Sequence, residues 1–338
     1  MNRTLALAIG DSSQVAEARR EAVALAMGLG FSETEAGRVA IVATEMVRNL
    51  VTHASEGRQF LLRALRCDGS TGVEMMALDK GPGIADIAQS LRDGHSTAGT
   101  PGAGLGAVFR LSTATDIHSL RGVGTALLAQ LWRSPGPPEA APGAAAVGGV
   151  CIAKPGELYN GDSWAARHVG GRTLLLAVDG LGHGEHAAEA SDAAVAAFEA
   201  HPALSPANGV QAIHAALRNT RGTAVGVVEL DSAKEVARYA GVGNIAGVIL
   251  SGDDRKSLVS HHGTAGGEAR RVEEFAYPWP RGALLIFHTD GISTRWGLGD
   301  YPGLSLRHPS LIAGVLYRDF ARGTDDVTVV VARRPAAG

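Results

Sequence analysis

The chain has 338 residues, of which 45% are hydrophobic, and a formal net charge of −3 at pH 7. This length suffices for two domains with separate cores, and the lack of a basic excess argues against a nucleic-acid partner. The two cysteines, Cys67 and Cys151, form no C-x-x-C pair, so we expect neither structural disulfides nor cysteine-bound zinc. There is no basic-then-apolar leader and no run of about 18 apolar residues, so we expect a cytoplasmic protein without membrane contact.

A change of composition divides the chain. Residues 134–147 are rich in proline, glycine and alanine and show no periodic apolar pattern, which is typical of a linker. We therefore expect one domain over residues 1–133 and a second over residues 148–334.

The first domain opens with a predicted strand over residues 4–9 and a helix that ends near Leu29. Ser32 and Glu35 then form an S-x-x-E capping box, which predicts a longer helix continuing to about His53. The apolar residues expected to face the core on this helix are Val39, Ile41, Val42, Met46, Val47 and Leu50.

Three polar residues of the longer helix, Glu45, Asn49 and His53, follow one another at four-residue spacing and so share one face. A Glu and an Asn one turn apart can hold a divalent cation and orient a nucleophile or a water. They can equally form a solvated stripe on an amphipathic helix, and the helix alone leaves both interpretations open. We interpret His53 as structural.

Residues 58–66 and 73–78 are predicted to pair as a hairpin whose second strand ends in Asp79. The sequence Asp79-Lys80-Gly81-Pro82-Gly83 fixes a carboxylate at a strand end beside two glycines. Such a carboxylate can accept a hydrogen bond from a flat amine while the glycines make room for its ring. The same D-x-G-x-G pattern also occurs in ordinary tight turns.

A glycine-rich run over residues 99–106 leads into a predicted helical segment over residues 107–111, and strands over 115–118 and 124–132 supply a last hairpin. Successive glycine amides at a helix N-terminus form an anion site suited to phosphates. Because the chain contains no Walker motif, this would be an ATP site of another kind.

Three motifs in this order resemble the N, G1 and G2 boxes of the GHKL ATPases: Glu45-Met46-Val47-Arg48-Asn49, Asp79-Lys80-Gly81-Pro82-Gly83 and Gly102-Ala103-Gly104-Leu105-Gly106. The short domain and the context of residues 43–54 most resemble the anti-sigma-factor serine kinases of RsbT and RsbW type, over about residues 3–133. The resemblance implies an α/β sandwich in which helices cover a mixed sheet.

The same resemblance implies roles for individual residues. Glu45 would be the general base on an acceptor serine, Asn49 would ligate the Mg²⁺ that bridges the ATP phosphates, and Asp79 would bind the adenine amine. Phosphoryl transfer needs positioning, a cation and a proton acceptor, with which this set agrees. The remaining nucleotide-site residues would be Gly81, Gly83, Gly102, Gly104, Leu105 and Gly106.

The C-terminal half alternates predicted strands with alanine-rich helices. The strands are expected at residues 147–153, 172–178, 223–230, 235–240, 246–250, 283–288 and 327–332, and the helices at residues 187–200 and 209–218. Asp162 is expected in a turn before the second of these strands.

Acidic residues lie at or near the ends of four strands: Asp162, Asp179, Asp290 and the pair Asp325 and Asp326. Carboxylates crowded together repel, which raises their pKa values and destabilises the fold unless a cation neutralises them. Hard oxygen ligands select Mg²⁺ or Mn²⁺ over zinc. The strand ends therefore indicate a metal site.

A second interpretation of the Asp179 strand end remains open at this point. Residues 182–187 imitate a G-x-G-x-x-A dinucleotide-binding turn, which needs another acid-ended strand about 20 residues further on. The corresponding region around Pro202 and Pro206 does not supply one. His183, in the same loop, is interpreted either as a proton donor or second-layer group or as a solvated loop histidine.

Four motifs of this half resemble the metal motifs of the PPM-type serine/threonine phosphatases, with the bacterial SpoIIE, RsbU and RsbX group as the closest branch. They are residues 160–162, 178–184, 289–291 and 325–328, and the match spans about residues 148–334. The resemblance implies an αββα sandwich with two Mg²⁺ or Mn²⁺ ions between its sheets and a bridging water that attacks phosphoserine or phosphothreonine.

By the same motifs, Asp179 would bridge the two ions with help from the Gly180 carbonyl, and Asp162 would ligate one of them. Asp290 and Asp325 would complete the other. Asp326 is an alternative ligand to Asp325, which the pattern favours.

The two resemblances together predict an α+β protein of two domains with a partner-switching function. A kinase would phosphorylate a serine on a STAS-type anti-anti-sigma protein and a tethered phosphatase would remove phosphate, with a sigma factor or a stressosome-like complex as a further partner and a homodimer by analogy. One rival is an N-terminal module that binds ATP or a sigma factor without catalysis, and a weaker one is a pseudoenzyme lacking both activities.

Overall fold

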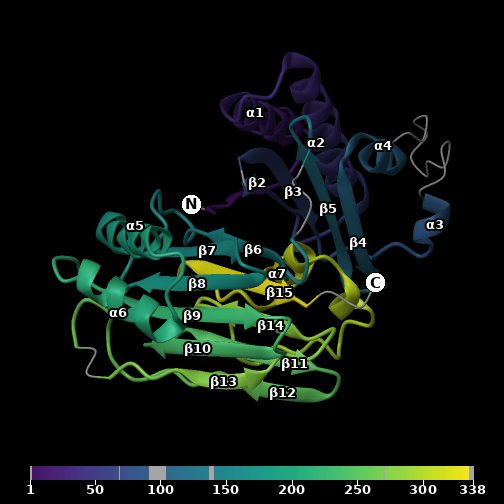
Figure 1. The fold of residues 1–338 in the computed structure, drawn as a ribbon. Helices are drawn as coiled ribbons and strands as arrows, with labels where there is room; N and C mark the ends of the chain where they lie inside the picture. The colour runs from purple at the N-terminus through teal and green to yellow at the C-terminus, as the bar shows by residue number, and fades with distance from the viewer. Residues whose placement is uncertain (1, 68, 91–103, 137–140, 269–270, 335–338) are drawn as a thin grey trace. The chain divides into compact units, whose positions relative to one another are not determined.

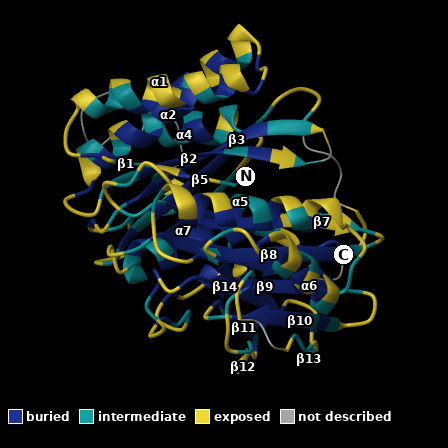
Figure 2. Ribbon diagram, turned by 90° about the vertical axis from the view of Figure 1, so that its left-hand side faces the viewer, coloured by how far each residue is buried: buried dark blue, intermediate teal, exposed yellow. Residues whose placement is uncertain are grey.

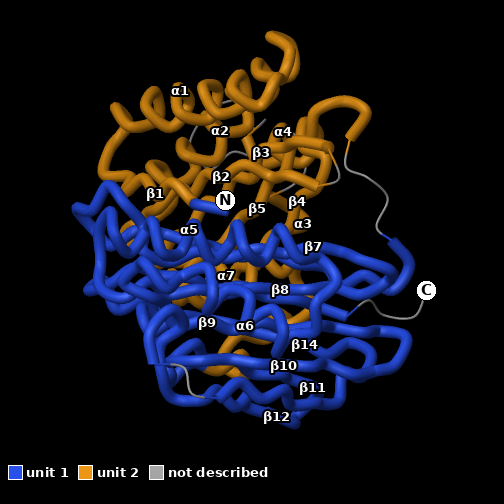
Figure 3. The backbone as a smooth tube through the Cα atoms, turned by 60° about the vertical axis from the view of Figure 1, so that its left-hand side comes forward, with its two compact units in different colours: residues 1–3, 140–296, 319–338 blue, residues 4–139, 297–318 orange. Residues whose placement is uncertain are grey.

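The computed structural model describes residues 2–67, 69–90, 104–136, 141–268 and 271–334 (Figure 1). Packing divides the chain into two compact units, which Figure 3 distinguishes by colour. Unit 1 comprises residues 1–3, 140–296 and 319–338, and unit 2 comprises residues 4–139 and 297–318. Each unit therefore contains residues from both ends of the chain, and a segment late in the sequence, residues 297–318, belongs to unit 2.

Unit 2 is built on one five-stranded sheet in the order β1-β2-β3-β5-β4. Its strands are β1 (Leu5–Ala8), β2 (Gln59–Cys67), β3 (Ser70–Leu78), β4 (Ala114–Leu120) and β5 (Gly124–Trp132). All four pairings are antiparallel, which differs from the expected mixed sheet. Two of the four pairings, β2 with β3 and β4 with β5, join strands that are consecutive in the chain, and consecutive strands linked by a short turn can only be antiparallel.

Helices α1 (Ser13–Gly28), α2 (Glu33–His53) and α4 (Gly104–Leu111) share a hydrophobic core with one face of this sheet, and a short α3 (Ile87–Ser90) follows β3. The expected capping box begins α2: the Glu35 amide donates to Ser32 Oγ at 3.3 Å, and the Ser32 amide donates to Glu35 Oε2 at 2.8 Å. The sequence signal for the start of this helix is confirmed.

The apolar face of α2 is as expected except at one position. Val39, Val42, Met46, Val47 and Leu50 are buried in the core. Ile41, also expected there, is 48% exposed. The buried positions follow the spacing of three and four residues that makes one helical stripe, and Ile41 is off that stripe by about half a turn.

Segment 297–318 covers the other face of the unit 2 sheet. It contains a 3₁₀ turn (Leu304–Leu306) and most of helix α7 (Pro309–Phe320). Along β3, Val73 and Met75 belong to the core shared with the helices. Met76, pointing to the opposite side, lies so close to Gly314 of α7 that a side chain there would collide with its sulfur.

Unit 1 contains two five-stranded sheets. The first has the order β13-β10-β9-β8-β7 and the second β12-β11-β14-β15-β6, with every pairing antiparallel. The strands of the first are β7 (Asp162–Val169), β8 (Arg172–Gly180), β9 (Thr223–Asp231), β10 (Val236–Val242) and β13 (Phe275–Pro278). Those of the second are β6 (Ala146–Ile152), β11 (Ala246–Ser251), β12 (Asp254–Ser257), β14 (Leu284–His288) and β15 (Val327–Arg333).

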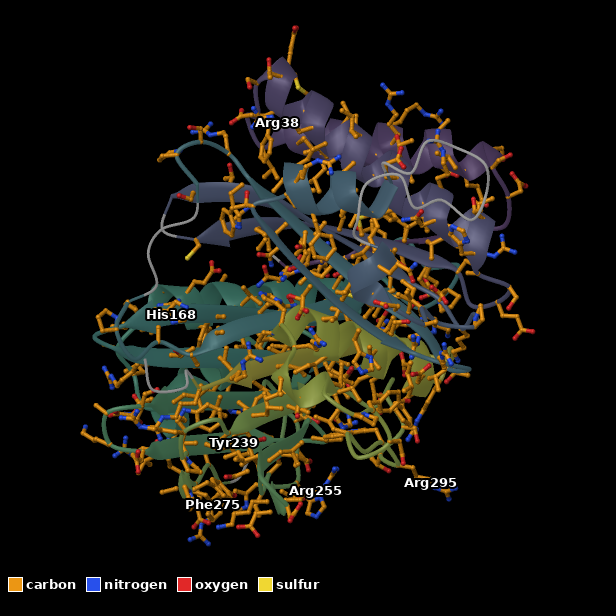
Figure 4. The ribbon with its side chains drawn as sticks, turned by 90° about the vertical axis from the view of Figure 1, so that its right-hand side faces the viewer. Arg38, His168, Tyr239, Arg255, Phe275 and Arg295 are labelled. Carbon is orange, nitrogen blue, oxygen red and sulfur yellow. The ribbon has the colours of Figure 1, made fainter. Side chains whose placement is uncertain are left out.

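One hydrophobic core lies between the two sheets and includes Leu175, Tyr239, Phe287 and Val330. Tyr239, labelled in Figure 4, meets the ring of Phe287 edge-on, with 5.6 Å between the ring centroids. Helices α5 (Glu185–Ala200) and α6 (Pro206–Ala216) pack on the outer side of the first sheet over a separate core. In Figure 2, β8, β9 and β14 are coloured as buried.

Among the described residues, six elements were not expected from the sequence: α3, β7, β12, β13, the 3₁₀ turn and α7. None of the described helices is both long and apolar enough to cross a bilayer.

Candidate nucleotide and metal sites

The N-terminal end of α4 brings two of the predicted motifs of unit 2 together. A Cβ atom placed on Gly104 would lie 3.2 Å from Glu45 Oε2 and 3.5 Å from Asn49 Oδ1. Glu45 is 20% exposed and its Oε1 accepts a hydrogen bond from Arg48 at 3.1 Å. Glu45 and Asn49 thus face the start of a helix, where the first amides have no intrahelical acceptors and can receive an anion, rather than forming a solvated stripe.

The helix begins earlier than expected, at Gly104 instead of residue 107. Gly104, Leu105 and Gly106 therefore form its first turn, with Gly106 buried and Leu105 packed against the core. Gly102, the first glycine of the predicted G2 box, lies outside the described residues.

Asp79 lies directly after β3, where the sequence predicted it. Its Oδ1 accepts hydrogen bonds from the Gly81 amide at 2.8 Å and the Thr125 amide at 3.3 Å. Burial raises the pKa of the Asp79 carboxyl, while the two amides and the positive charges of Arg318 and His53 oppose that rise. His53 itself lies at the exposed end of α2.

The glycines after Asp79 are required by close approach of the backbone. Gly83 has a φ of +74°, and a Cβ there would lie 2.5 Å from the carbonyl oxygen of Leu120. A Cβ on Gly81 would lie 2.9 Å from Asp79 Oδ1. The turn is thus built around the carboxylate and leaves no room for side chains of its own.

In unit 1, Asp162 and Asp179 are direct neighbours on adjacent strands. Asp162 begins β7 rather than lying in a turn, and it pairs in register with Asp179 near the end of β8. It is 2% exposed, and the Thr289 hydroxyl donates to its Oδ2 at 2.6 Å. Burial raises the pKa of Asp162 well above its ordinary value, and the charge of Asp179 adds to the rise.

Burial also raises the pKa of Asp179, to about 7, with further contributions from the charges of Asp290, Asp325 and Asp326. The next residue, Gly180, cannot carry a side chain because a Cβ there would collide with the carbonyl oxygen of Ala187 at the start of α5. The strand end therefore lies against the helix with its backbone in direct contact.

The other predicted ligands differ in their hydrogen bonds. Asp290 Oδ2 accepts a hydrogen bond from the Asn244 side chain at 2.9 Å. Burial raises the pKa of Asp290, and the negative charge of Asp325 raises it further. The positive charge of Arg322 opposes this rise.

Asp326 is 3% exposed, and both of its oxygens accept from backbone amides, Oδ1 from Lys154 and Oδ2 from Gly161, each at 2.8 Å. Burial raises the pKa of Asp326, although those two hydrogen bonds oppose the rise. Asp325 accepts a single such bond, from the Asp326 amide at 2.9 Å.

Within the described ranges, no three His, Cys, Asp or Glu side chains are gathered closely enough to hold a metal ion. The aspartates nevertheless act on one another's pKa values, so they share one electrostatic environment. Uncompensated carboxylates repel, which opposes close gathering without a cation. The oxygen-only donor set suits Mg²⁺ or Mn²⁺.

The loop after Asp179 does not form a dinucleotide-binding unit. That motif requires a parallel strand after the helix, whereas β8 is followed through α5 and α6 by β9, its antiparallel neighbour. His183 in this loop is 56% exposed and its Nδ1 lies 2.9 Å from Glu157 Oε1. The structure thus places His183 on the surface, within hydrogen-bond distance of the Glu157 carboxylate.

No site role was predicted from the sequence for Thr289, Asn244 or Arg318, whose side chains make polar contacts to the predicted sites. Thr289 and Asn244 donate to predicted metal ligands, and Arg318 donates to the backbone of Asp79. Thr289 directly precedes Asp290 in its motif, which was a usable signal. Arg318 follows no pattern that points to residue 79.

Comparison with known proteins accounts for both halves of the chain. Residues 10–131 match the histidine kinase-like ATPase domain family, and residues 169–335 match the SpoIIE family, named for stage II sporulation protein E. The chain is 33% identical over 132 residues to the serine/threonine-protein kinase RsbT of Bacillus subtilis (strain 168), a match that covers 39% of this chain and 98% of RsbT.

Two solved structures extend the comparison. A chain from a structural study of the bacterial stressosome as a modular system adapted to control secondary messenger signalling is 29% identical, with a TM-score of 0.53, and the match covers 56% of this chain and 99% of that one. The second is the PP2C phosphatase domain of SpoIIE from Bacillus subtilis with a fragment of its regulatory domain, which has a TM-score of 0.50 at 16% identity. This match covers 96% of this chain and 95% of the SpoIIE chain. At this identity the likeness shows the fold alone. The chain therefore belongs to the RsbT family of histidine kinase-like ATPase domains in its N-terminal part, and it carries a SpoIIE phosphatase domain of PP2C type in its C-terminal part.

Proposed function

We propose that this protein is a bifunctional partner-switching regulator, in which one domain phosphorylates a serine on a partner protein and the other removes phosphate from the same or a related partner. The observation that supports the proposal is that one chain contains both a candidate nucleotide site and a candidate metal site. Glu45 and Asn49 face the start of α4, and Asp162 lies opposite Asp179 on paired strands.

The kinase half of the proposal assigns three roles. The Glu45 carboxylate accepts the proton of the acceptor serine hydroxyl, the Asn49 side-chain oxygen holds the Mg²⁺ of the bound ATP, and the Asp79 carboxylate accepts a hydrogen bond from the adenine amine. The first amides of α4 receive the phosphates. This arrangement supplies the positioning, cation and proton acceptor that phosphoryl transfer requires.

The phosphatase half assigns the metal ligands. Asp179, with the Gly180 carbonyl, would bridge two Mg²⁺ or Mn²⁺ ions, with Asp162 on one and Asp290 and Asp325 on the other. Asp325 is preferred to Asp326 because both oxygens of Asp326 already accept backbone hydrogen bonds. When bound, two such ions lower the pKa of a water that they share and make it a nucleophile at neutral pH.

The proposed partner is a STAS-type anti-anti-sigma protein, alone or within a stressosome-like assembly. Support comes from the likeness to RsbT and to a chain from a stressosome study. A sigma factor as a second partner and a homodimer of this chain are further parts of the proposal.

A second candidate function keeps the phosphatase and treats unit 2 as a nucleotide-binding module without catalysis. The hydrogen bond from Arg48 to Glu45 Oε1 at 3.1 Å favours it, because that bond occupies one of the two carboxylate oxygens that could accept the serine proton. Glu45→Ala separates the two functions, since a binding module would keep ATP affinity and partner regulation in that variant.

The proposal is tested by incubating the full chain with labelled ATP and candidate STAS proteins, in parallel with an Asp179→Ala chain. The second variant is needed because an active phosphatase would erase the product. The kinase half is supported if a serine of the STAS protein is labelled and this labelling is lost with Glu45→Ala. The control Glu21→Ala, which changes an exposed residue of α1, should keep the labelling. If neither chain labels any candidate, the kinase half is wrong, and metal-dependent hydrolysis of p-nitrophenyl phosphate tests the phosphatase half independently.

A further inference from the structure

Arg318 belongs by packing to unit 2, although it comes from the C-terminal half of the sequence. It is the last residue of segment 297–318 and only 9% exposed. A buried guanidinium needs partners for its donors, and those partners show what the residue does.

The segment is held on the unit 2 sheet by hydrogen bonds along its length. His118 Nε2 lies 3.1 Å from the carbonyl oxygen of Pro302. The Asp116 carboxylate accepts from the His308 amide at 2.6 Å and from the Arg307 guanidinium at 3.3 Å. Strand β4 therefore fixes the first half of the segment.

A buried polar network fixes the start of α7. Glu74 on β3 accepts hydrogen bonds from Arg63 at 2.5 Å, from Gln130 at 2.6 Å and from the Ser310 hydroxyl at 2.8 Å. Buried polar groups are costly to leave unpaired, so this network specifies one position of the helix on the sheet.

At the far end of the segment, Arg318 reaches the backbone beside the nucleotide site. Its Nη1 donates to the carbonyl oxygen of Asp79 at 2.8 Å and lies 3.4 Å from that of Thr125. These two residues also bond to each other, since the Asp79 amide donates to Thr125 O at 3.0 Å and the Thr125 amide to Asp79 Oδ1 at 3.3 Å. One guanidinium therefore holds both strand ends that orient the Asp79 carboxylate.

We propose that Arg318 is a positioning residue of the nucleotide site, which sets where the Asp79 carboxylate meets the base. The proposal rests on the function proposed above, in which Asp79 accepts a hydrogen bond from the adenine amine. It adds that the ATP site of the N-terminal domain is completed by a residue from the other half of the chain.

The chemical consequence is base discrimination. Adenine presents an amino donor to a carboxylate, whereas guanine presents a carbonyl acceptor at the same position. A site built to hydrogen-bond one group rejects a ligand that lacks it, and the strength of that rejection depends on placement. If the Asp79 carboxylate shifts, ATP should lose affinity while GTP, which shares only the sugar and phosphates, loses less.

The test measures the dissociation constants of Mg²⁺-ATP and Mg²⁺-GTP by calorimetry on the full chain. Arg318→Ala should weaken ATP binding about tenfold, as expected for the loss of a charged hydrogen-bond donor, and lower the preference for ATP over GTP. Arg318→Lys, which keeps the cation on a shorter side chain without the planar fork, should give an intermediate preference. Arg295→Ala removes an exposed arginine (Figure 4) and should leave both constants unchanged.

A purely structural role of Arg318 would weaken both nucleotides equally. Equal weakening in a folded Arg318→Ala chain, or an unchanged ratio of the two constants, would therefore overturn the inference. If Arg318→Ala does not fold, the Arg318→Lys variant provides the test. A ratio of the ATP and GTP dissociation constants equal to that of the wild type in this variant would contradict the proposal. A wild-type chain that binds neither nucleotide would refute the proposed ATP site and this inference with it.

Discussion

Asp162 and Asp179 lie directly opposite each other on the antiparallel strands β7 and β8. Residues in this relationship have Cβ atoms about 4.5–5.5 Å apart, and like charges there destabilise a sheet. Asp162 is buried and Asp179 is half-buried, which reduces the amount of water that screens their charges. The pair is therefore unfavourable in the fold unless it binds protons or a cation.

The first prediction concerns pH and stability without metal. Because the pKa of Asp179 is raised to about 7, the folded state binds more protons than the unfolded state between about pH 4, the ordinary range of an aspartate, and pH 7. The metal-free protein should therefore lose stability as pH rises through this window, by up to about 1.4 kcal/mol for each unit of the shift. Urea unfolding of unit 1 in EDTA, followed by a unit 1 tryptophan signal, measures the change.

Two controls accompany that measurement. Added Mn²⁺ should stabilise the protein more at pH 8 than at pH 5, and Asp179→Asn should flatten the pH dependence. Asp253→Asn, in the exposed turn between β11 and β12, should not. A wild-type stability that is level, or that rises, from pH 5 to pH 7 in EDTA would refute the electrostatic account of this site.

The second prediction concerns Thr289. Its hydroxyl donates to Asp162 and accepts from the Thr328 amide, so it orients a proposed metal ligand. Thr289→Val keeps the shape of the side chain but removes both of its hydrogen bonds. Metal affinity should fall about 10- to 100-fold, because hydrogen bonds that orient a metal ligand typically contribute that much. The half-saturating Mn²⁺ concentration for p-nitrophenyl phosphate hydrolysis gives the result, with Thr289→Ser as the retained-hydroxyl control. A metal requirement identical to wild type would show that Thr289 does not orient Asp162.

The third prediction concerns the buried pair of Arg63 and Glu74, which are 6% and 3% exposed. Glu74→Ala leaves the Arg63 charge buried and also removes the acceptor for Ser310 and Gln130, so unit 2 should lose about 3–5 kcal/mol of stability. Urea unfolding measures the loss. Replacing both partners, as Arg63→Met with Glu74→Leu, should recover much of it, because no unpaired charge remains. A double variant as unstable as Glu74→Ala would contradict this explanation.

The fourth prediction concerns the G1 turn. Gly83 and Gly122 share a φ of +74°, but a Cβ would lie 2.5 Å from Leu120 O at Gly83 and would meet nothing within 4 Å at Gly122. Both alanine variants carry the conformational strain, of order 1–3 kcal/mol, and only Gly83→Ala adds a collision beside Asp79. Thermal unfolding and ATP titration should therefore show a larger loss for Gly83→Ala, and equal losses would show that close approach is unimportant there.

The sequence predicted best what is encoded locally. The capping box at Ser32 and the acid-then-glycine strand ends at Asp79 and Asp179 each lie within a few residues, and the structure has them in the expected elements. The order of the three N-terminal motifs was enough to identify the family that the comparisons establish. Their proposed chemical roles remain predictions.

What the sequence did not predict depends on distant partners or weak patterns. Strand β7 was missed because it starts with an acid and reads as a turn, although Asp162 is buried by its pairing with β8. The position of α7 depends on bonds such as Ser310 to Glu74, whose partners are far apart in the chain. No local periodicity carries that information.

The interleaving of the two units also bears on how the protein is made. Unit 2 starts near the beginning of the chain, yet its last segment ends at residue 318. Domains generally fold as units in the order of their synthesis. Here one face of the unit 2 sheet stays uncovered until segment 297–318 has been synthesised, long after the strands of that sheet, so folding of the two units should finish together.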